Sequence, residues 1–286
     1  MHKQIPSSRP QPVGRGIPPR IRLVAIDLDG TLLSSRKSIT PKTHTAIRAV
    51  LAKGVKIVLA TARPPRSVRT YYEALKLDTP TINYNGALIW DEIRRRAVEH
   101  VPLDVAVAKK IVAWARKIYP EVLVSVEILD KWYTDHYEAI PEYMTETAKQ
   151  FTPDFIGPLA AFMRVPITKL MLLGVPVRIV ELEKGLAIKF ASVVSQTRSD
   201  AHMLQLMSPE TSKARALAKI AHLLEVQPEE VLAIGDAPND VHMLQWAGVA
   251  AVPENGWEAA KLVADMIVPS NDEDGVAAAL QKYVLS

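Results

Sequence analysis

The chain has 286 residues, 48% hydrophobic and 23% charged, a balance that is typical of folded globular proteins. No apolar run is long enough to span a bilayer, and the absence of cysteine excludes disulfides, thiolate zinc sites and cysteine nucleophiles and favours a reducing cytosol. Five of the 35 basic residues lie in the first 26 residues, where there is no acid, so the net charge of +4 belongs to this segment and does not indicate nucleic-acid binding.

Residues 1–20 are rich in proline and arginine and contain no apolar stretch that could be buried. They lack the apolar segment of a signal peptide, and we expect a disordered basic leader. Arginine and serine without acidic residues also occur in transit peptides, so import into an organelle stays open beside a cytoplasmic location.

Short apolar runs and helical stretches alternate over residues 21–101. Three of the runs predict buried strands, at 21–26, 55–60 and 81–84. Between the first two strands, Thr40 followed by Pro41 predicts the start of a helix, and Gly54 predicts its end. The segments "ALIW" and "AVEHV" on either side of "IRRR" predict a hairpin at the end of this part.

The pattern changes over residues 102–204, which hold a long helical stretch and several predicted strands but no cluster of catalytic residue types. We expect this part to form a second, α+β domain inserted into the first.

Residues 205–286 return to the alternating pattern. Ser212 predicts the N-cap of a helix, and "VLAI" at 231–234 predicts a buried strand. Strands that alternate with helices predict an α/β fold, a Rossmann-like doubly wound parallel sheet built from 21–101 and 205–286.

Acidic residues follow two of the predicted strands, where ligands bind in sheets of this kind. Asp27 and Asp29 come after the first strand, and Asp236 and Asp240 come after the strand at 231–234. One aspartate after a strand is a common turn residue, but four at two strand ends repel one another unless a cation lies between them. Oxygen ligands without a cluster of His or Cys favour Mg²⁺.

A magnesium ion, a carboxylate nucleophile and a neighbouring acid are the components of phosphoryl transfer through an aspartyl-phosphate. Asp27 would attack phosphorus in line, and Asp29 would protonate the leaving oxygen and then deprotonate the hydrolytic water. Gly30 would allow a tight turn whose backbone amides face the phosphate.

Several motifs carry a family resemblance. In chain order they are "DLDGTL", "ATARP", "NGA", "SPETSKARAL", "GDAPNDVHML" and "ADMIVPSNDEDGVAAAL". Their identity and order resemble the haloacid dehalogenase superfamily of phosphatases, and in detail its Cof-type branch of sugar-phosphate phosphatases. The resemblance implies that 21–101 and 205–286 form the catalytic core and that 102–204 is a cap domain that sets substrate specificity.

The resemblance implies roles for the acidic residues. Asp27 would be the nucleophile and a magnesium ligand, and Asp29 the general acid and base and a ligand through its carbonyl. Asp236 would bind Mg²⁺ directly, while Asn239 and Asp240 would support the site from behind the ligands.

The resemblance also implies a set of groups that contact the phosphate. Thr61 and Lys213 would neutralise the phosphoryl oxygens as catalytic residues. On its own, Thr61 could equally cap the next helix, and Lys213 could be an ordinary solvated lysine. The candidate phosphate- or substrate-binding residues are Asp27, Gly30, Thr61, Arg63, Asn85, Gly86, Lys213 and Asn239.

The chain departs from the family pattern at three places. Ala62 and Ala214 stand where the family has glycine, and "VPENG" around Asn255 replaces "MGNA". Since no motif carboxylate is affected, we expect activity to survive and the edge of the pocket to differ.

In the predicted cap, Lys169, Trp132, Tyr133 and His136 are candidates for recognising the leaving group. A core or surface role is the expectation for each of them.

The sequence therefore predicts a Mg²⁺-dependent phosphatase of a small soluble phosphomonoester, with sugar phosphates as one class, and with neither nucleic acid nor membrane as partner. The alternatives are a phosphomutase of the same superfamily and a catalytically idle module that binds a phosphate or a protein. The identity of the ester and the oligomeric state do not follow from the sequence.

Overall fold

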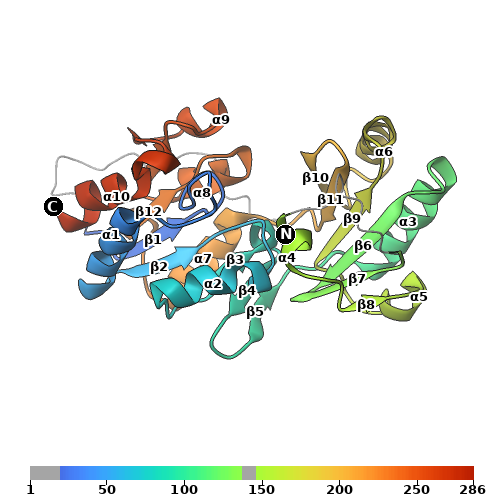
Figure 1. Ribbon diagram of the computed structural model, residues 1–286, viewed down its shortest axis with the longest axis horizontal. Coiled ribbons are helices and arrows are strands. Elements are labelled where there is room, and N and C mark those ends of the chain that lie inside the picture. The colour runs from blue at the N-terminus through green and yellow to red at the C-terminus, as the bar shows by residue number, and fades with distance from the viewer. Residues whose placement is uncertain (1–19, 137–145) are drawn as a thin grey trace. The chain divides into compact units, whose positions relative to one another are not determined.

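The computed structural model describes residues 20–136 and 146–286, so the predicted leader, apart from Arg20, lies outside the described residues. The chain divides into two compact units, each of which is described separately below (Figure 1). The first unit comprises Met1–Thr61, Arg69–Ile82 and Ser212–Ser286, and the second comprises Ala62–Val68 and Asn83–Thr211.

The first unit is built on a five-stranded sheet in the order β14-β13-β12-β1-β2. All of its pairings are parallel. The strands are β1 (Leu23–Ile26), β2 (Lys56–Leu59), β12 (Val231–Ile234), β13 (Val249–Pro253) and β14 (Met266–Val268). Ile26 pairs with both Leu59 and Ile234, so the central strands end at the same level. This sheet confirms the predicted parallel α/β fold.

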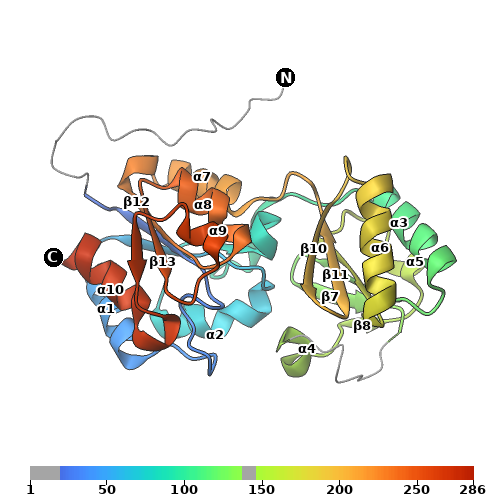
Figure 2. The same ribbon diagram turned by 90° about the horizontal axis from the view of Figure 1, so that it is seen from above.

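Helices cover both faces of this sheet. They are α1 (Pro41–Ala52), α2 (Pro65–Leu75), α7 (Lys213–Leu223), α8 (Val241–Trp246), α9 (Glu258–Lys261) and α10 (Gly275–Leu280). Figure 2 shows α1 and α10 on one side of the sheet and α7 and α8 on the other, as a doubly wound sheet requires. The predicted caps are present, because the side chains of Thr40 and Ser212 accept hydrogen bonds from the amides of Thr43 and Arg215.

The second unit contains a six-stranded sheet in the order β10-β11-β9-β6-β7-β8. Its strands are β6 (Leu123–Ile128), β7 (Lys131–Thr134), β8 (Phe155–Ile156), β9 (Lys169–Leu173), β10 (Ser195–Asp200) and β11 (Met203–Met207). Its helices are α3 (Val105–Ile118), α4 (Glu146–Gln150), α5 (Leu159–Phe162) and α6 (Pro176–Lys189). Apolar side chains of α3 and α6 form one buried core with those of the sheet, which gives the α+β character expected of this part.

Shorter elements complete both units. The predicted hairpin is present as β4 (Leu88–Asp91) and β5 (Arg96–His100), and β3 (Thr81–Asn83) lies where the chain passes from the first unit to the second. Single helical turns are η1 (Tyr84–Gly86), η3 (Pro228–Glu230), η4 (Pro238–Asp240), η5 (Asn271–Glu273) and η6 (Gln281–Leu285).

The compact units divide at 82/83 and 211/212, and they assign residues 62–68 to the second unit. The predicted boundaries at 101/102 and 204/205 divide the catalytic core from the cap, and they stay a prediction. None of the helices in the described part of the chain has the length and apolar character needed to cross a membrane.

Candidate active site

Three aspartates meet at the carboxyl ends of the central strands of the first unit. Asp27 directly follows β1, Asp236 follows β12 after one glycine, and Asp240 ends the helical turn η4. One carboxylate oxygen from each lies within 4.8 Å of the others, and all three residues are buried. The equal level at which β1 and β12 end brings these side chains together.

Lys213 joins two of these carboxylates. It is the first residue of α7, just after the Ser212 cap, and its side chain is fully buried. Its Nζ donates to Asp27 Oδ1 at 2.6 Å and to Asp240 Oδ1 at 2.7 Å. Because an unpaired ammonium is costly to bury, this lysine is bound to the site and is not a solvated helix residue.

The third carboxylate, that of Asp236, is held by the segment that follows β1. Thr31 Oγ1 donates to Asp236 Oδ1 at 3.0 Å. Gly30 has φ +84°, and a Cβ there would lie 2.5 Å from Asp236 Oδ2, so both the turn and the close approach require glycine.

Asp240 supports the turn that carries Asp236. Its Oδ2 accepts from the backbone amides of Asp236 and Ala237, at 3.1 and 3.0 Å. Since Oδ1 accepts from Lys213, both oxygens of Asp240 have donors.

The electrostatics of the cluster reflect an excess of negative charge. Burial is the largest influence on Asp27 and raises its pKa. The Lys213 ammonium lowers this pKa and the charges of Asp240 and Asp236 raise it, and the net result lies well above the usual value. Burial and the charge of Asp240 likewise raise the pKa of Asp236 to about 6. Burial lowers the pKa of Lys213, but the charges of Asp240 and Asp27 outweigh this and raise it.

The donor chemistry fits a hard divalent cation. Three buried carboxylates face one ammonium, which leaves two uncompensated negative charges when all of them are ionised. Oxygen ligands of this kind suit Mg²⁺. The residues present therefore fit the predicted metal.

Asp29 lies outside this cluster. Its carboxylate is 40% exposed, and its Oδ1 lies 2.7 Å from Lys37 Nζ. The motif pattern did not point to Lys37, which is eight residues further along the loop.

Thr61 and Asn239 stand at the same edge of the sheet. Thr61 is buried two residues after β2, and its amide donates to Ile82 O at 2.8 Å. Asn239 is an exposed residue of η4, directly before Asp240.

Arg63, Asn85 and Gly86 belong to the second unit. The Arg63 carbonyl accepts from Asn83 Nδ2 at 3.1 Å and from the Tyr84 amide at 3.3 Å, which attaches it to the turn that contains Asn85 and Gly86. Contact of these three residues with a phosphate stays a prediction.

Two of the candidate residues in the predicted cap make contacts that are typical of a structural role. Trp132 is buried and donates through Nε1 to Ser125 Oγ, and the ring of Tyr133 stacks on Phe162. His136 is exposed.

Lys169 belongs to a buried charged group that the sequence analysis missed, which we call the Glu127 cluster (Arg66, Tyr84, Glu127 and Lys169). Glu127 Oε2 accepts from Arg66 Nη2 at 2.7 Å and from Tyr84 OH at 2.6 Å, and Oε1 lies 3.1 Å from Lys169 Nζ. The sequence contained no signal for it, because its members are far apart in the chain.

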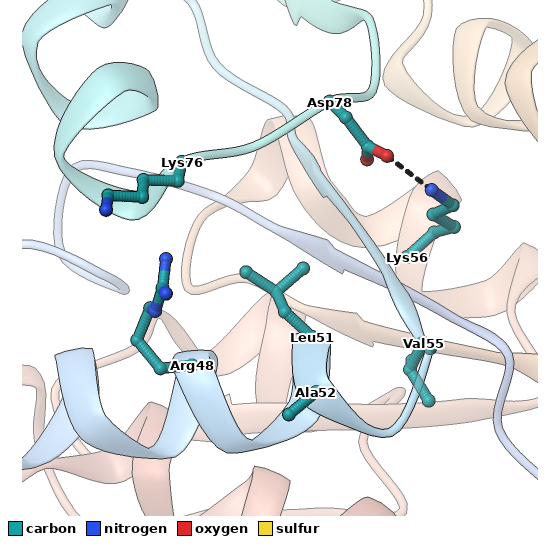
Figure 3. Close-up of a pocket in the computed structure, with 8 residues that line it drawn as sticks. Arg48, Leu51, Ala52, Val55, Lys56, Lys76 and Asp78 are labelled. Carbon is teal, nitrogen blue, oxygen red and sulfur yellow. Dashed lines mark hydrogen bonds and ion pairs between the residues drawn. The ribbon is translucent and has the colours of Figure 1, made fainter.

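A cavity of about 350 Å³ in the first unit has no part in the predicted chemistry (Figure 3). It lies where α1 ends and β2 begins, and Arg48, Lys76 and the Lys56–Asp78 ion pair line it together with Leu51 and Val55. It contains none of the predicted site residues, which stand at the other ends of the strands.

Comparison with known sequences supports one family. Residues 24–280 match the haloacid dehalogenase-like hydrolase family. The 5-amino-6-(5-phospho-D-ribitylamino)uracil phosphatase YitU of Bacillus subtilis is 30% identical over 267 residues, an alignment that covers 91% of this chain and 97% of that protein. The phosphatase YwpJ of the same organism is 31% identical, with 90% and 98% covered.

Solved structures agree in fold. A haloacid dehalogenase-like hydrolase from Bacteroides thetaiotaomicron has a TM-score of 0.83 at 25% identity and covers 92% of this chain and 99% of its own. The protein TM0651 from Thermotoga maritima has a TM-score of 0.81 at 26% identity, with 92% and 97% covered.

Proposed function

The chain belongs to the haloacid dehalogenase-like hydrolase family and is a phosphatase of that family, and we propose that it is a Mg²⁺-dependent enzyme that hydrolyses a small phosphomonoester through an aspartyl-phosphate. The observation that carries this proposal is the buried cluster of Asp27, Asp236 and Asp240 around Lys213. Its excess negative charge calls for a divalent cation, and Asp27 is the carboxylate that follows the first strand directly.

In the first step, one oxygen of the Asp27 carboxylate attacks phosphorus in line while the bond to the leaving oxygen breaks. Lys213 occupies Asp27 Oδ1, so we assign the attack to Oδ2. Asp29, whose carboxyl is 40% exposed and can exchange protons with solvent, gives its proton to the leaving alcohol.

In the second step, Asp29 takes a proton from a water molecule that attacks the aspartyl-phosphate. The bond between phosphorus and Asp27 breaks, inorganic phosphate leaves, and both carboxyl groups return to their first state. Because the Lys37 ammonium occupies Asp29 Oδ1, we assign the proton transfer to Oδ2.

The transferred phosphoryl group carries negative charge that has to be neutralised. We assign this to the Lys213 ammonium and the Thr61 hydroxyl. Asp27, Asp236 and the carbonyl of Asp29 would hold Mg²⁺, with Asp240 and Asn239 behind them, and the bound ion would supply further charge neutralisation.

The substrate class that we propose is a phosphorylated sugar or sugar alcohol. Relatives in Bacillus subtilis bear names that specify 5-amino-6-(5-phospho-D-ribitylamino)uracil, whose phosphate sits on a ribityl chain. That compound belongs in any test. The absence of cysteine supports a cytoplasmic location.

The test is phosphate release from a panel of sugar phosphates and that uracil derivative, with Mg²⁺ and with a chelator. Asp27→Asn should lose at least about 10³-fold in kcat, since the amide cannot act as the nucleophile. Asp78→Asn, which makes the same change in a carboxylate that is 57% exposed, should behave as wild type.

Four outcomes would redirect the assignment. Retained activity in Asp27→Asn, or indifference to chelation, contradicts the proposed chemistry. Isomerised sugar phosphate without net phosphate release would identify a phosphomutase, and tight binding without turnover would identify a binding module.

A further inference from the structure

The segment that follows the nucleophile, residues 28–35, is held from two sides. On its inner side, Thr31 donates to Asp236 Oδ1, and Gly30 has no room for a Cβ against Asp236 Oδ2. The backbone of this segment thus lies directly on one of the three clustered carboxylates.

On its outer side, the side chain of Asn255 contacts the same segment. Asn255 Nδ2 donates to the Gly30 carbonyl at 2.8 Å, and Asn255 Oδ1 accepts from the Asn271 amide at 2.9 Å. Asn271 Nδ2 in turn donates to the Leu33 carbonyl at 2.8 Å. Two asparagines from the loops after β13 and β14 therefore hold both ends of Gly30–Leu33.

The loop that carries Asn255 is itself attached to the sheet and to the site. The Glu254 amide donates to Val268 O at 2.9 Å, and the Trp257 amide donates to the Asp236 carbonyl at 2.7 Å. The backbone on either side of Asn255 is thus held in place by hydrogen bonds.

An amide suits this position because it offers a donor and an acceptor at the same end of a short side chain. Aspartate would keep the acceptor for Asn271 but would lose the donor to Gly30. It would also add a negative charge beside a cluster in which carboxylates already outnumber ammonium groups.

We propose that Asn255 is a positioning residue of the active site, which acts with Asn271 to hold Gly30–Leu33 against Asp236. Through this segment the pair sets the placement of Asp29, which precedes Gly30 directly, and of the turn that faces the phosphate. The inference rests on the proposed function for its catalytic consequence, whereas the restraint on the segment is independent of any reaction.

The experiment compares Asn255→Ala, Asn271→Ala and the double variant with Glu254→Ala. Glu254 is an exposed neighbour on the same loop whose side chain makes no hydrogen bond or ion pair among the described residues, and it is therefore the matched control. Turnover of p-nitrophenyl phosphate gives kcat and KM, and hydrogen exchange of the metal-free protein reports on the amides of residues 28–35.

We expect Asn255→Ala to lower kcat about 10-fold with KM within about twofold, because a small misplacement of catalytic groups costs rate more than binding. Exchange over residues 28–35 should accelerate, and the double variant should be no worse than the more impaired single variant, because both residues act through one segment. Asn255→Asp, which removes the donor to Gly30 and adds a negative charge beside the cluster, should be at least as impaired as Asn255→Ala.

Unchanged exchange and unchanged kcat in Asn255→Ala would overturn the proposal. Faster exchange with wild-type kcat would also overturn it, since the restraint would then have no catalytic role. If the wild type itself releases no phosphate, the proposed function fails, and the exchange rates alone decide whether Asn255 restrains the segment.

Discussion

Lys213 shows how strongly one residue depends on its surroundings. Its ammonium lies between Asp27 and Asp240, within hydrogen-bond reach of both. Breaking a buried ion pair on one side leaves an uncompensated charge, which is more harmful than never having had the pair.

We therefore expect Lys213→Met to destabilise the metal-free protein by about 3–5 kcal/mol, measured by urea unfolding with a chelator present. Added Mg²⁺ should restore a large part of this loss. Lys219→Met changes an exposed lysine on the same helix, where a surface ion pair is worth at most about 1 kcal/mol, and it should lower the unfolding midpoint far less. Equal midpoints for the two variants would contradict the account of Lys213.

A comparison of Gly30 with Gly54 distinguishes the cost of a strained backbone from the cost of a clash with a neighbouring side chain. Both have positive φ, +84° and +79°, but only Gly30 has a carboxylate where a Cβ would stand, and Gly54 has nothing within 4 Å. Alanine at either position should cost about 1–2 kcal/mol in left-handed strain.

Gly30→Ala should in addition displace Asp236 and weaken Mg²⁺ binding, whereas Gly54→Ala should bind Mg²⁺ as wild type does. Calorimetric titration with Mg²⁺ alone measures the difference. Equal Mg²⁺ affinities in the two variants would show that the approach of Gly30 to Asp236 has no effect on the site.

At the scale of elements, the Glu127 cluster joins four pieces of the second unit. Arg66 comes from the first turn of α2, Tyr84 from η1, Glu127 from β6 and Lys169 from β9. Burial raises the pKa of Glu127, but the charges of Lys169 and Arg66 and the hydrogen bonds from Tyr84 and Arg66 outweigh it, so the pKa lies below its usual value. The cluster therefore holds an ionised glutamate in the core.

The lowered pKa of Glu127 determines how the stability of the folded chain changes with pH. Because the pKa of Glu127 is lower in the folded than in the unfolded chain, its stabilisation is complete above the unfolded value of 4.5 and is lost as pH falls through the folded value. Glu127→Gln should cost about 3–5 kcal/mol at pH 7, since Arg66 and Lys169 stay buried without it.

Urea unfolding at pH 7 and below pH 4 checks this, and the loss in Glu127→Gln should shrink at the lower pH. Glu121→Gln, an exposed change in the same unit, is the control and should show little loss at either pH. A loss in Glu127→Gln that does not depend on pH would mean that charge is not the cause.

At the scale of the whole molecule, the cluster of Asp27, Asp236 and Asp240 links stability to pH in the opposite direction. The pKa of Asp236 is raised to about 6 and that of Asp27 is raised as well, so ionising them costs folding free energy as pH rises through about 6. If the site binds Mg²⁺ as proposed, the ion would bind the ionised form and remove this cost.

The increase in thermal stability on adding Mg²⁺ should consequently grow from pH 5 to pH 7.5, and it should reach about 2.7 kcal/mol at a hundred times the Kd. Thermal unfolding with Mg²⁺ and with a chelator measures it. Asp236→Asn should abolish most of the increase, and an increase independent of pH would contradict the raised pKa values.

Much of the fold of the first unit could be predicted from local sequence pattern. Alternating apolar runs and helical stretches predicted the parallel sheet of the first unit, and Thr40 and Ser212 predicted two helix starts. Strand ends are visible in a sequence because burial ends there, and parallel strands end at one edge. For this reason the local pattern alone was enough to place Asp27 and Asp236 together.

Only the tertiary structure decided which atoms meet. By local pattern alone, Lys213 is a surface lysine, and only its place in a family motif marks it out; α7 brings it to Asp27, 186 residues away. Asn255 lies in a stretch that departs from the family motif, and it reaches the carbonyl of Gly30, 225 residues away. The Glu127 cluster had no local signal at all. Periodicity fixes which face of an element is buried, but hydrogen bonds and charge pairs between distant elements depend on side-chain positions that only the packed chain defines.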